Sequence, residues 1–132
     1  MPKVLIAEDE SVLRDAYVMI LGHAGYRVVP AVDGRDTLDK LEKERPELLI
    51  LDMLMPGLSG LEVLKHQRMQ PLRPGLKIIA FTNLSDPKTL LELERQGVDK
   101  YLLKSSIQPR MLISHVAEVL AQEPARASSL PT

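Results

Sequence analysis

The stretch LLILDMLMPGLSG, residues 48–60, decides how this chain folds. Its four leading apolar residues predict a buried strand, and Pro56-Gly57 followed by Ser59 predicts a loop that leads into a helix. Asp52 then lies at the carboxyl end of a strand, under that loop. Open α/β sheets bind their ligands at this position, so Asp52 is the first candidate for a functional residue.

The composition is that of one ordinary soluble domain. The chain has 132 residues, 45% of them apolar and 27% charged, and its net charge of −1 gives no overall attraction for nucleic acid or anionic membranes. The absence of cysteine excludes disulfides and thiolate catalysis. No apolar stretch approaches the ~20 residues of a membrane span, and the run at 4–7 is too short for a signal peptide. We therefore expect a cytoplasmic protein.

Five apolar runs alternate with five helical patterns along the chain. Strands are expected at residues 3–7, 26–30, 47–51, 77–81 and 98–103. Helices are expected from a Ser11 cap to Gly25, at 36–45, at 60–70, from an Asp86 cap to Gln96, and from Ser106 or Gln108 to Ala121. Residues 1–121 then form the domain, and the tail 122–132, rich in Pro, Ser and Ala, is expected to be disordered.

The alternation of strands and helices predicts an α/β fold, in which one parallel sheet is covered by helices on both faces. The first, third and fourth strands are nearly all apolar, as central parallel strands are, whereas the second and fifth carry more polar residues. The expected strand order is therefore 2-1-3-4-5. Right-handed crossovers then put the first and last helices on one face and the other three on the opposite face.

The acidic pair Glu8-Asp9 follows the first strand, and the expected order brings it beside Asp52 at the switch point between strands one and three. Carboxylates this close repel one another unless a cation lies among them. Oxygen ligands with open positions suit Mg²⁺, and the backbone carbonyl of Leu54 could reach the same ion. The competing interpretation is that acidic residues at strand ends merely face solvent or cap helices.

Thr82 and Lys104 follow the fourth and fifth strands and are expected at the same edge of the sheet. The lysine ammonium can pair with a carboxylate and then with a phosphoryl oxygen, and the threonine hydroxyl can donate to another. With a metal and these donors, Asp52 can act as a nucleophile that forms an acyl phosphate. The chain has no Gly-rich phosphate loop, so the phosphoryl group must come from a donor other than a bound nucleotide.

These motifs and their spacing resemble the receiver domain of two-component response regulators. The resemblance extends over about residues 3–121 and rests on Glu8-Asp9, Asp52, Met55-Pro56-Gly57, Gly60, Thr82, Tyr101 and Lys104. It implies a flavodoxin-like three-layer sandwich: a five-stranded parallel sheet in the middle, with five helices divided between the two outer layers.

The resemblance also implies a role for each site residue. Asp52 would be the phosphoacceptor, and Mg²⁺ would be held by Glu8, Asp9, Asp52 and the carbonyl of Leu54. Thr82 and Lys104 would contact the phosphoryl group. The donor would be a phosphohistidine on a sensor histidine kinase or a His-phosphotransfer protein. The protein would be a signalling domain and not an enzyme, apart from catalysing its own phosphotransfer and dephosphorylation.

Phosphorylation is expected to act through Thr82 and Tyr101. Thr82 would move toward the phosphoryl group and Tyr101 would rotate inward, which would rearrange the fourth helix, the fifth strand and the fifth helix. At least one leucine of the fourth helix is expected to be exposed for a downstream protein partner or a homodimer, among Leu90, Leu91 and Leu93. The competing interpretation of Tyr101 is an edge-strand tyrosine without a role.

Two positions qualify this interpretation. Ser105 stands where the family usually has a proline, so the Lys104–Ser105 peptide is either trans or cis and strained. Leu54 and Leu84 cannot orient an attacking water, which predicts slow self-dephosphorylation.

Two other functions stay open. One is a metal-dependent phosphohydrolase of the dehalogenase type, which would need a second Asp where Leu54 stands, and the other is a constitutive scaffold that is never phosphorylated.

Overall fold

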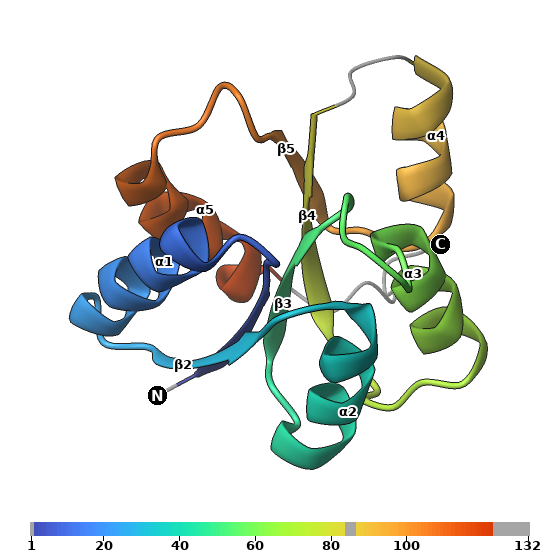
Figure 1. Ribbon diagram of the computed structural model, residues 1–132, viewed down its shortest axis with the longest axis horizontal. Helices are drawn as coiled ribbons and strands as arrows, with labels where there is room; N and C mark the ends of the chain where they lie inside the picture. Colours follow the sequence, from blue (N-terminus) through green and yellow to red (C-terminus); the bar gives the residue numbers. More distant parts are fainter. Residues whose placement is uncertain (1, 84–86, 123–132) are drawn as a thin grey trace.

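The computed structural model describes residues 2–83 and 87–122. Five parallel strands form one sheet in the order β2-β1-β3-β4-β5, which confirms the order expected from the sequence (Figure 1). The strands are β1 (Lys3–Ala7), β2 (Arg27–Ala31), β3 (Leu48–Asp52), β4 (Lys77–Thr82) and β5 (Lys100–Leu103). The central strands are almost wholly buried, whereas β2 and β5 at the edges are partly exposed.

Helices cover both faces of the sheet (Figure 1). They are α1 (Ser11–His23), α2 (Gly34–Glu44), α3 (Gly60–Met69), α4 (Pro87–Arg95) and α5 (Leu112–Ala121), with one 3₁₀ turn, η1 (Pro109–Met111), before α5. Helices α1 and α5 share one hydrophobic core and α2, α3 and α4 share the other, as right-handed crossovers require. Within the described part of the chain, no helix is long and apolar enough to cross a bilayer.

One aliphatic core fills each side of the sheet, because alternate residues of a strand point to opposite faces. On the α1 and α5 side, Phe81 of β4 stacks on Tyr17 with the ring centroids 5.4 Å apart. On the other side, Leu49 of β3 lies in a cluster that includes Leu64 and Leu93 of the covering helices. Each fully buried leucine contributes about 1.5–3 kcal/mol of hydrophobic stabilisation. The sheet is thus fixed from both sides, and only its edges reach solvent.

The helix starts differ from expectation at three places. Ser11 was expected to cap α1, but it is the first helical residue, because the Glu10 carbonyl already accepts the Arg14 N–H at 2.9 Å. Helix α2 begins at Gly34 and not at residue 36, because the Asp33 side chain accepts the Asp36 N–H and caps it. The last helix begins at Leu112, because residues 109–111 form the tighter η1 turn. Ser59, by contrast, caps α3 in a reciprocal capping box with Glu62.

Strand β1 has the expected bounds, and the bounds of the other four strands shift by one or two residues. Strand β3 includes Asp52, which pairs with Phe81 of β4, and β5 begins at Lys100, after the turn at Gly97 where φ is 84°. The Lys104–Ser105 peptide is trans, like every other peptide bond in residues 2–83 and 87–122. The expected Asp86 cap and the tail residues 123–132 lie outside the described residues.

Candidate functional site

Asp52 is buried at the carboxyl end of β3, with only 3% of its surface exposed. The four preceding apolar residues are fully buried and carry the carboxylate inside with them. Its Oδ1 accepts a hydrogen bond from the Leu54 N–H at 3.1 Å. The Met53 N–H donates to the Phe81 carbonyl at 2.9 Å, which continues the β3–β4 pairing one residue past the strand. These bonds fix the Asp52 carboxylate under the loop that leads to α3.

Glu8 is the first residue after β1 and is 1% exposed. Its N–H donates to the Ala31 carbonyl at 3.1 Å, and its Oε2 accepts the Glu10 N–H at 3.1 Å. The carbonyl of Glu8 accepts a bond from Arg14 Nη1 at 2.7 Å. Asp9 is exposed instead. The acidic pair therefore divides, with one carboxylate facing inward toward Asp52 and the other at the surface of the same site.

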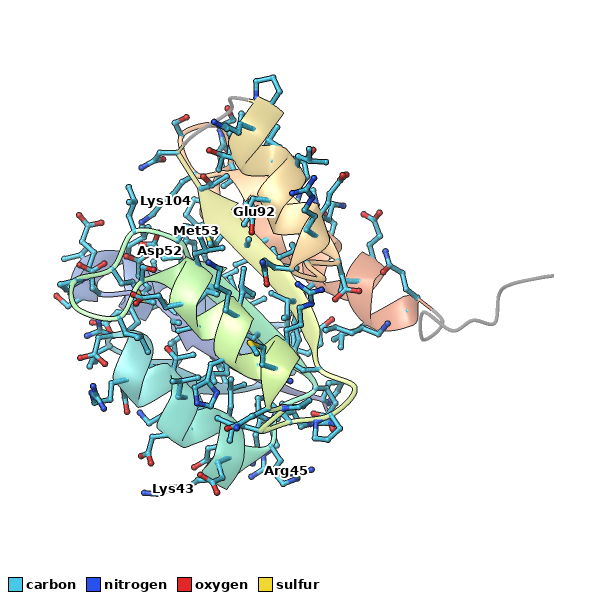
Figure 2. The ribbon with its side chains drawn as sticks, turned by 90° about the vertical axis from the view of Figure 1, so that its right-hand side faces the viewer. Lys43, Arg45, Asp52, Met53, Glu92 and Lys104 are labelled. Carbon is cyan, nitrogen blue, oxygen red and sulfur yellow. The ribbon has the colours of Figure 1, made fainter. Side chains whose placement is uncertain are left out.

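Lys104 joins the two buried carboxylates. Its Nζ lies 2.7 Å from Asp52 Oδ2 and 3.0 Å from Glu8 Oε1, and Figure 2 shows Lys104 and Asp52 at the same edge of the sheet. The backbone N–H of Lys104 donates to the Thr82 carbonyl at 2.8 Å. This bond continues the β4–β5 pairing past Leu103 and directs the lysine side chain over the acids. Buried carboxylates are costly without a paired cation, and Lys104 supplies that cation.

Burial and the contacts between these groups shift the pKa values of Glu8 and Lys104. Burial raises the pKa of the Glu8 carboxyl above its ordinary value, because desolvation outweighs the hydrogen bonds from Lys104 and the Glu10 N–H. Burial acts to lower the pKa of Lys104, but its hydrogen bonds to Asp52 and Glu8 outweigh desolvation and raise the pKa above its ordinary value. The lysine therefore stays charged at neutral pH.

The acidic cluster has the chemistry of a divalent-cation site. Glu8, Asp9 and Asp52 each bring one carboxylate oxygen within 4.8 Å of the others. Three carboxylates and the one ammonium of Lys104 leave a formal charge of −2. Within the described residues, the buried Glu8 Oε1 accepts no hydrogen bond, although the Lys104 Nζ lies close to it. An oxygen-only donor set with this charge and a spare buried acceptor fits Mg²⁺.

Two glycines allow the loop after β3 to pack tightly against the starts of α2 and α3. A Cβ on Gly60 would lie 2.7 Å from the Cα of Met53 and 2.9 Å from the carbonyl oxygen of Asp52. A Cβ on Gly34 would overlap the carbonyl oxygen of Leu58. The backbone on both sides of the loop is therefore held in place, and the Asp52 carboxylate is held with it.

Thr82 and Tyr101 lie on neighbouring strands near this site. Thr82 is the last residue of β4, is 2% exposed, and pairs in register with Leu103 of β5. Tyr101 is half-buried, pairs with Ala80, and packs against the hydrophobic core on the side of α2, α3 and α4. The fold thus brings the acids, Thr82 and Lys104 to one edge of the sheet and places Tyr101 one strand away from Thr82.

Two contributors to the site were not singled out from the sequence. Arg14 ties down the loop after β1 from six residues away, and only the direction of α1 makes that spacing meaningful. Position 54 was expected to contribute its carbonyl, whereas its N–H holds Asp52 in the structure. Any residue other than proline would provide that N–H, so the identity of Leu54 carries no signal.

Comparison with known proteins identifies the family. The family described as the response regulator receiver domain matches residues 4–117, which is most of the chain. The chain therefore belongs to this family, the receiver domains of two-component response regulators.

The individual relatives agree with this assignment. The transcriptional regulatory protein AfsQ1 of Streptomyces coelicolor is 34% identical over 120 residues, which are 91% of this chain and 52% of that protein. The alkaline phosphatase synthesis transcriptional regulatory protein PhoP of Bacillus subtilis is 35% identical over 128 residues, 96% of this chain and 52% of that protein. The chain thus spans about half the length of these relatives.

A solved structure supports the fold as well. The chemotaxis protein CheY4 of Vibrio cholerae superposes with a TM-score of 0.82 at 33% identity, and the match covers 90% of this chain and 98% of that one. The expected flavodoxin-like sandwich is confirmed by this likeness and by the observed strand order.

Proposed function

We propose that this receiver domain accepts a phosphoryl group on Asp52 from a phosphohistidine of a sensor histidine kinase or a His-phosphotransfer protein. The observation that carries the proposal is a buried carboxylate, Asp52, held 2.7 Å from the Lys104 ammonium beside two further carboxylates. Such a concentration of buried charge lowers stability and is typical of a functional site.

The transfer requires few groups from the protein. One oxygen of Asp52 attacks the phosphorus, the new O–P bond forms as the N–P bond breaks, and the leaving imidazole nitrogen keeps the bonding electron pair. The Lys104 ammonium, which already donates to Asp52 Oδ2, is placed to pair with a phosphoryl oxygen. The hydroxyl of Thr82, at the end of the neighbouring strand, would donate to another.

Glu8, Asp9, Asp52 and the Leu54 carbonyl are the groups that would hold Mg²⁺. The ion would neutralise the negative charge that an incoming phosphoryl group adds to the three carboxylates. The Oε1 of Glu8 supports this part of the proposal, because within the described residues this buried oxygen accepts no hydrogen bond and has only the Lys104 ammonium nearby, which leaves it able to bind a cation.

The proposed response to phosphorylation is a two-state rearrangement through Thr82 and Tyr101 that changes the face formed by α4, β5 and α5. On α4, Leu91 is 50% exposed, whereas Leu93 is buried and Leu90 packs partly against the core. Leu91 is thus the exposed leucine that was expected on the fourth helix. We propose that this face binds a downstream protein or a second copy of the chain, without direct contact to nucleic acid or membrane. The expected cytoplasmic location belongs to the same proposal.

Intact mass spectrometry after incubation with acetyl phosphate and Mg²⁺ tests the proposed phosphoacceptor. Wild type should gain a single phosphoryl adduct, and Asp52→Asn should gain none. Asp15→Asn, which changes an exposed acid of α1, is the matched control and should keep the adduct. No adduct on wild type with acetyl phosphate or with histidine kinases would favour the constitutive scaffold.

The second alternative, a phosphohydrolase, makes a different prediction. Position 54, where such an enzyme would need its second acid, is a leucine whose side chain is 60% exposed beside the site. Turnover of phosphate esters should therefore be absent, and the acyl phosphate should decay slowly in a chemical-quench time course. Leu84, the other residue behind this expectation, lies outside the described residues. Rapid decay of the adduct would contradict the proposed role of position 54.

A further inference from the structure

A cavity of about 250 Å³ lies between α3 and α4, behind the loop that follows Asp52. Apolar side chains form most of its wall, among them Met53, Leu61 and Leu93, and its polar groups come from Thr82, Thr89 and Glu92. Ligand pockets have this character, with apolar walls and a few polar groups that fix the orientation of the bound molecule. The volume is below the range of sites for drug-sized molecules, so the cavity suits a small ligand.

Glu92 is the only carboxylate among the described residues that line this cavity. It is half-buried on α4, and Figure 2 shows it on the side of the helix that faces α3, near Met53. Its Oε2 accepts a hydrogen bond from Gln96 Nε2 at 2.8 Å. Within residues 2–83 and 87–122, no lysine, arginine or histidine forms an ion pair with it, whereas Lys104 serves the buried Glu8. A carboxylate in such surroundings lacks the cation that would offset its loss of hydration.

We propose that this cavity is a binding site for a small organic cation, an alkyl- or arylammonium ion. The ammonium pairs with Glu92 through a charge-assisted hydrogen bond, and the hydrocarbon part lies against Met53, Leu61 and Leu93. The carboxylate disfavours anions, and a neutral molecule would gain the apolar contacts alone. The cavity borders the Asp52 cluster, because Met53, Leu54 and Thr82 line it, but its carboxylate, Glu92, belongs to α4 and is none of the acids of that cluster. Binding of the ammonium ion does not require the proposed phosphorylation.

The test is a titration of the full ¹⁵N-labelled chain with n-hexylammonium, followed by amide chemical shifts, with Mg²⁺ present to keep the probe away from the acidic cluster. Shifts are expected at Met53, Leu61, Thr82 and Leu93, which line the cavity. 1-Hexanol should bind more weakly at the same place, and hexanoate should not bind. The Glu92→Gln variant should lose roughly tenfold or more in affinity for hexylammonium, the expected value of a charged hydrogen bond, and keep its affinity for hexanol.

Two further variants make the result decisive. Glu94→Gln changes an exposed acid on the same helix, outside the cavity, and should leave the affinity for hexylammonium unchanged. Leu61→Trp fills the cavity and should abolish binding of both hexylammonium and hexanol. The proposal is overturned if Leu61 of α3 and Leu93 of α4 show no shifts, if hexanol binds as tightly as hexylammonium, or if Glu94→Gln weakens binding as much as Glu92→Gln.

Discussion

The two ends of the sheet treat polar groups in opposite ways. At the amino end, backbone N–H groups near the strand starts donate to side-chain carboxylates, such as Lys3 N–H to Glu47 Oε1 and Ile78 N–H to Asp99 Oδ2, both at 2.7 Å. At the carboxyl end two buried carboxylates share one ammonium, and Glu8 Oε1 accepts no hydrogen bond within the described residues. Satisfied polar groups stabilise a fold. A concentration of buried charge lowers its stability and is typical of a functional site.

The loop between α3 and β4 continues the pattern of the amino end. The buried side chain of Gln67 accepts the Leu72 N–H at 3.0 Å and donates to the Arg73 carbonyl at 2.6 Å. Arg73 Nε in turn donates to the Pro46 carbonyl at 2.7 Å, which links this loop to the one before β3. Each group in this set has a partner, so substitutions here should change stability and leave the chemistry alone.

The largest effect is expected for Lys104→Met. Removal of the shared ammonium leaves Asp52 and Glu8 buried without a cation, which should lower the free energy of unfolding by about 3 kcal/mol at neutral pH. Added Mg²⁺ should restore part of this loss, because the proposed Mg²⁺ site uses the same carboxylates and exists in the folded state alone. Urea unfolding with and without Mg²⁺ measures both effects.

The control is Lys43→Met at the opposite end of the molecule (Figure 2). The Lys43–Asp39 pair is exposed, with side-chain exposures of 70% and 53%, so its loss should cost less than about 0.5 kcal/mol and Mg²⁺ should have no effect on it. Equal losses of unfolding free energy in the two variants would show that the buried ion pairs of Lys104 contribute no more to stability than the exposed pair of Lys43.

Gly60→Ala should have the next largest effect. The added Cβ would press on the backbone of Asp52 and Met53, so we expect a loss of about 2 kcal/mol and slower phosphorylation by acetyl phosphate. Gly22→Ala in α1 is the matched control, because nothing lies within 4 Å of its Cβ position and alanine favours helix by about 0.5–1 kcal/mol. Denaturant unfolding should move in opposite directions for the two variants, and a gain of stability in both would contradict the close packing of the loop.

Asp99→Ala tests the amino end. Loss of the acceptor for the Ile78 N–H should lower the free energy of unfolding by about 1 kcal/mol. The rate of phosphorylation should stay at the wild-type value, because the change lies at the far end of β4. A fall in both the free energy of unfolding and the phosphorylation rate would mean that the two ends of the sheet are coupled. The amino end would then not serve stability alone.

The fold and the convergence of the acids and Lys104 were predictable from the sequence because they depend on patterns. The nearly all-apolar first, third and fourth strands and the more polar second and fifth were enough to order the strands, and that order brings Glu8 beside Asp52. Local competition between backbone partners was not predictable. Ser11 is a residue type that favours the N-cap, yet it is the first helical residue and Glu10 takes the cap position, because the Glu10 carbonyl accepts the Arg14 N–H. The inward turn of Glu8 against the outward turn of Asp9 depends equally on contacts that no pattern encodes.

His115 gives the smallest expected effect, a pH dependence outside the acidic site. Its Nδ1 is buried and has no hydrogen-bond partner within the described residues. Burial lowers the pKa of His115 below its ordinary value of 6.5, and the nearby Lys100 lowers it further, against an opposing effect of Glu118. Because the unfolded chain then binds the proton more tightly, this contribution to stability is complete above the ordinary pKa and is lost as the pH falls through the lowered pKa.

The difference between wild type and His115→Leu isolates that contribution from the titration of the carboxylates. Urea unfolding at about pH 7.5 and about pH 5.5, on the two sides of the ordinary histidine pKa, should show a larger acid-induced loss in wild type than in the variant. His66→Gln, which changes an exposed histidine of α3, should keep the wild-type loss. If His115→Leu and wild type lose the same free energy of unfolding on acidification, the buried Nδ1 of His115 has no part in the acid sensitivity of the fold.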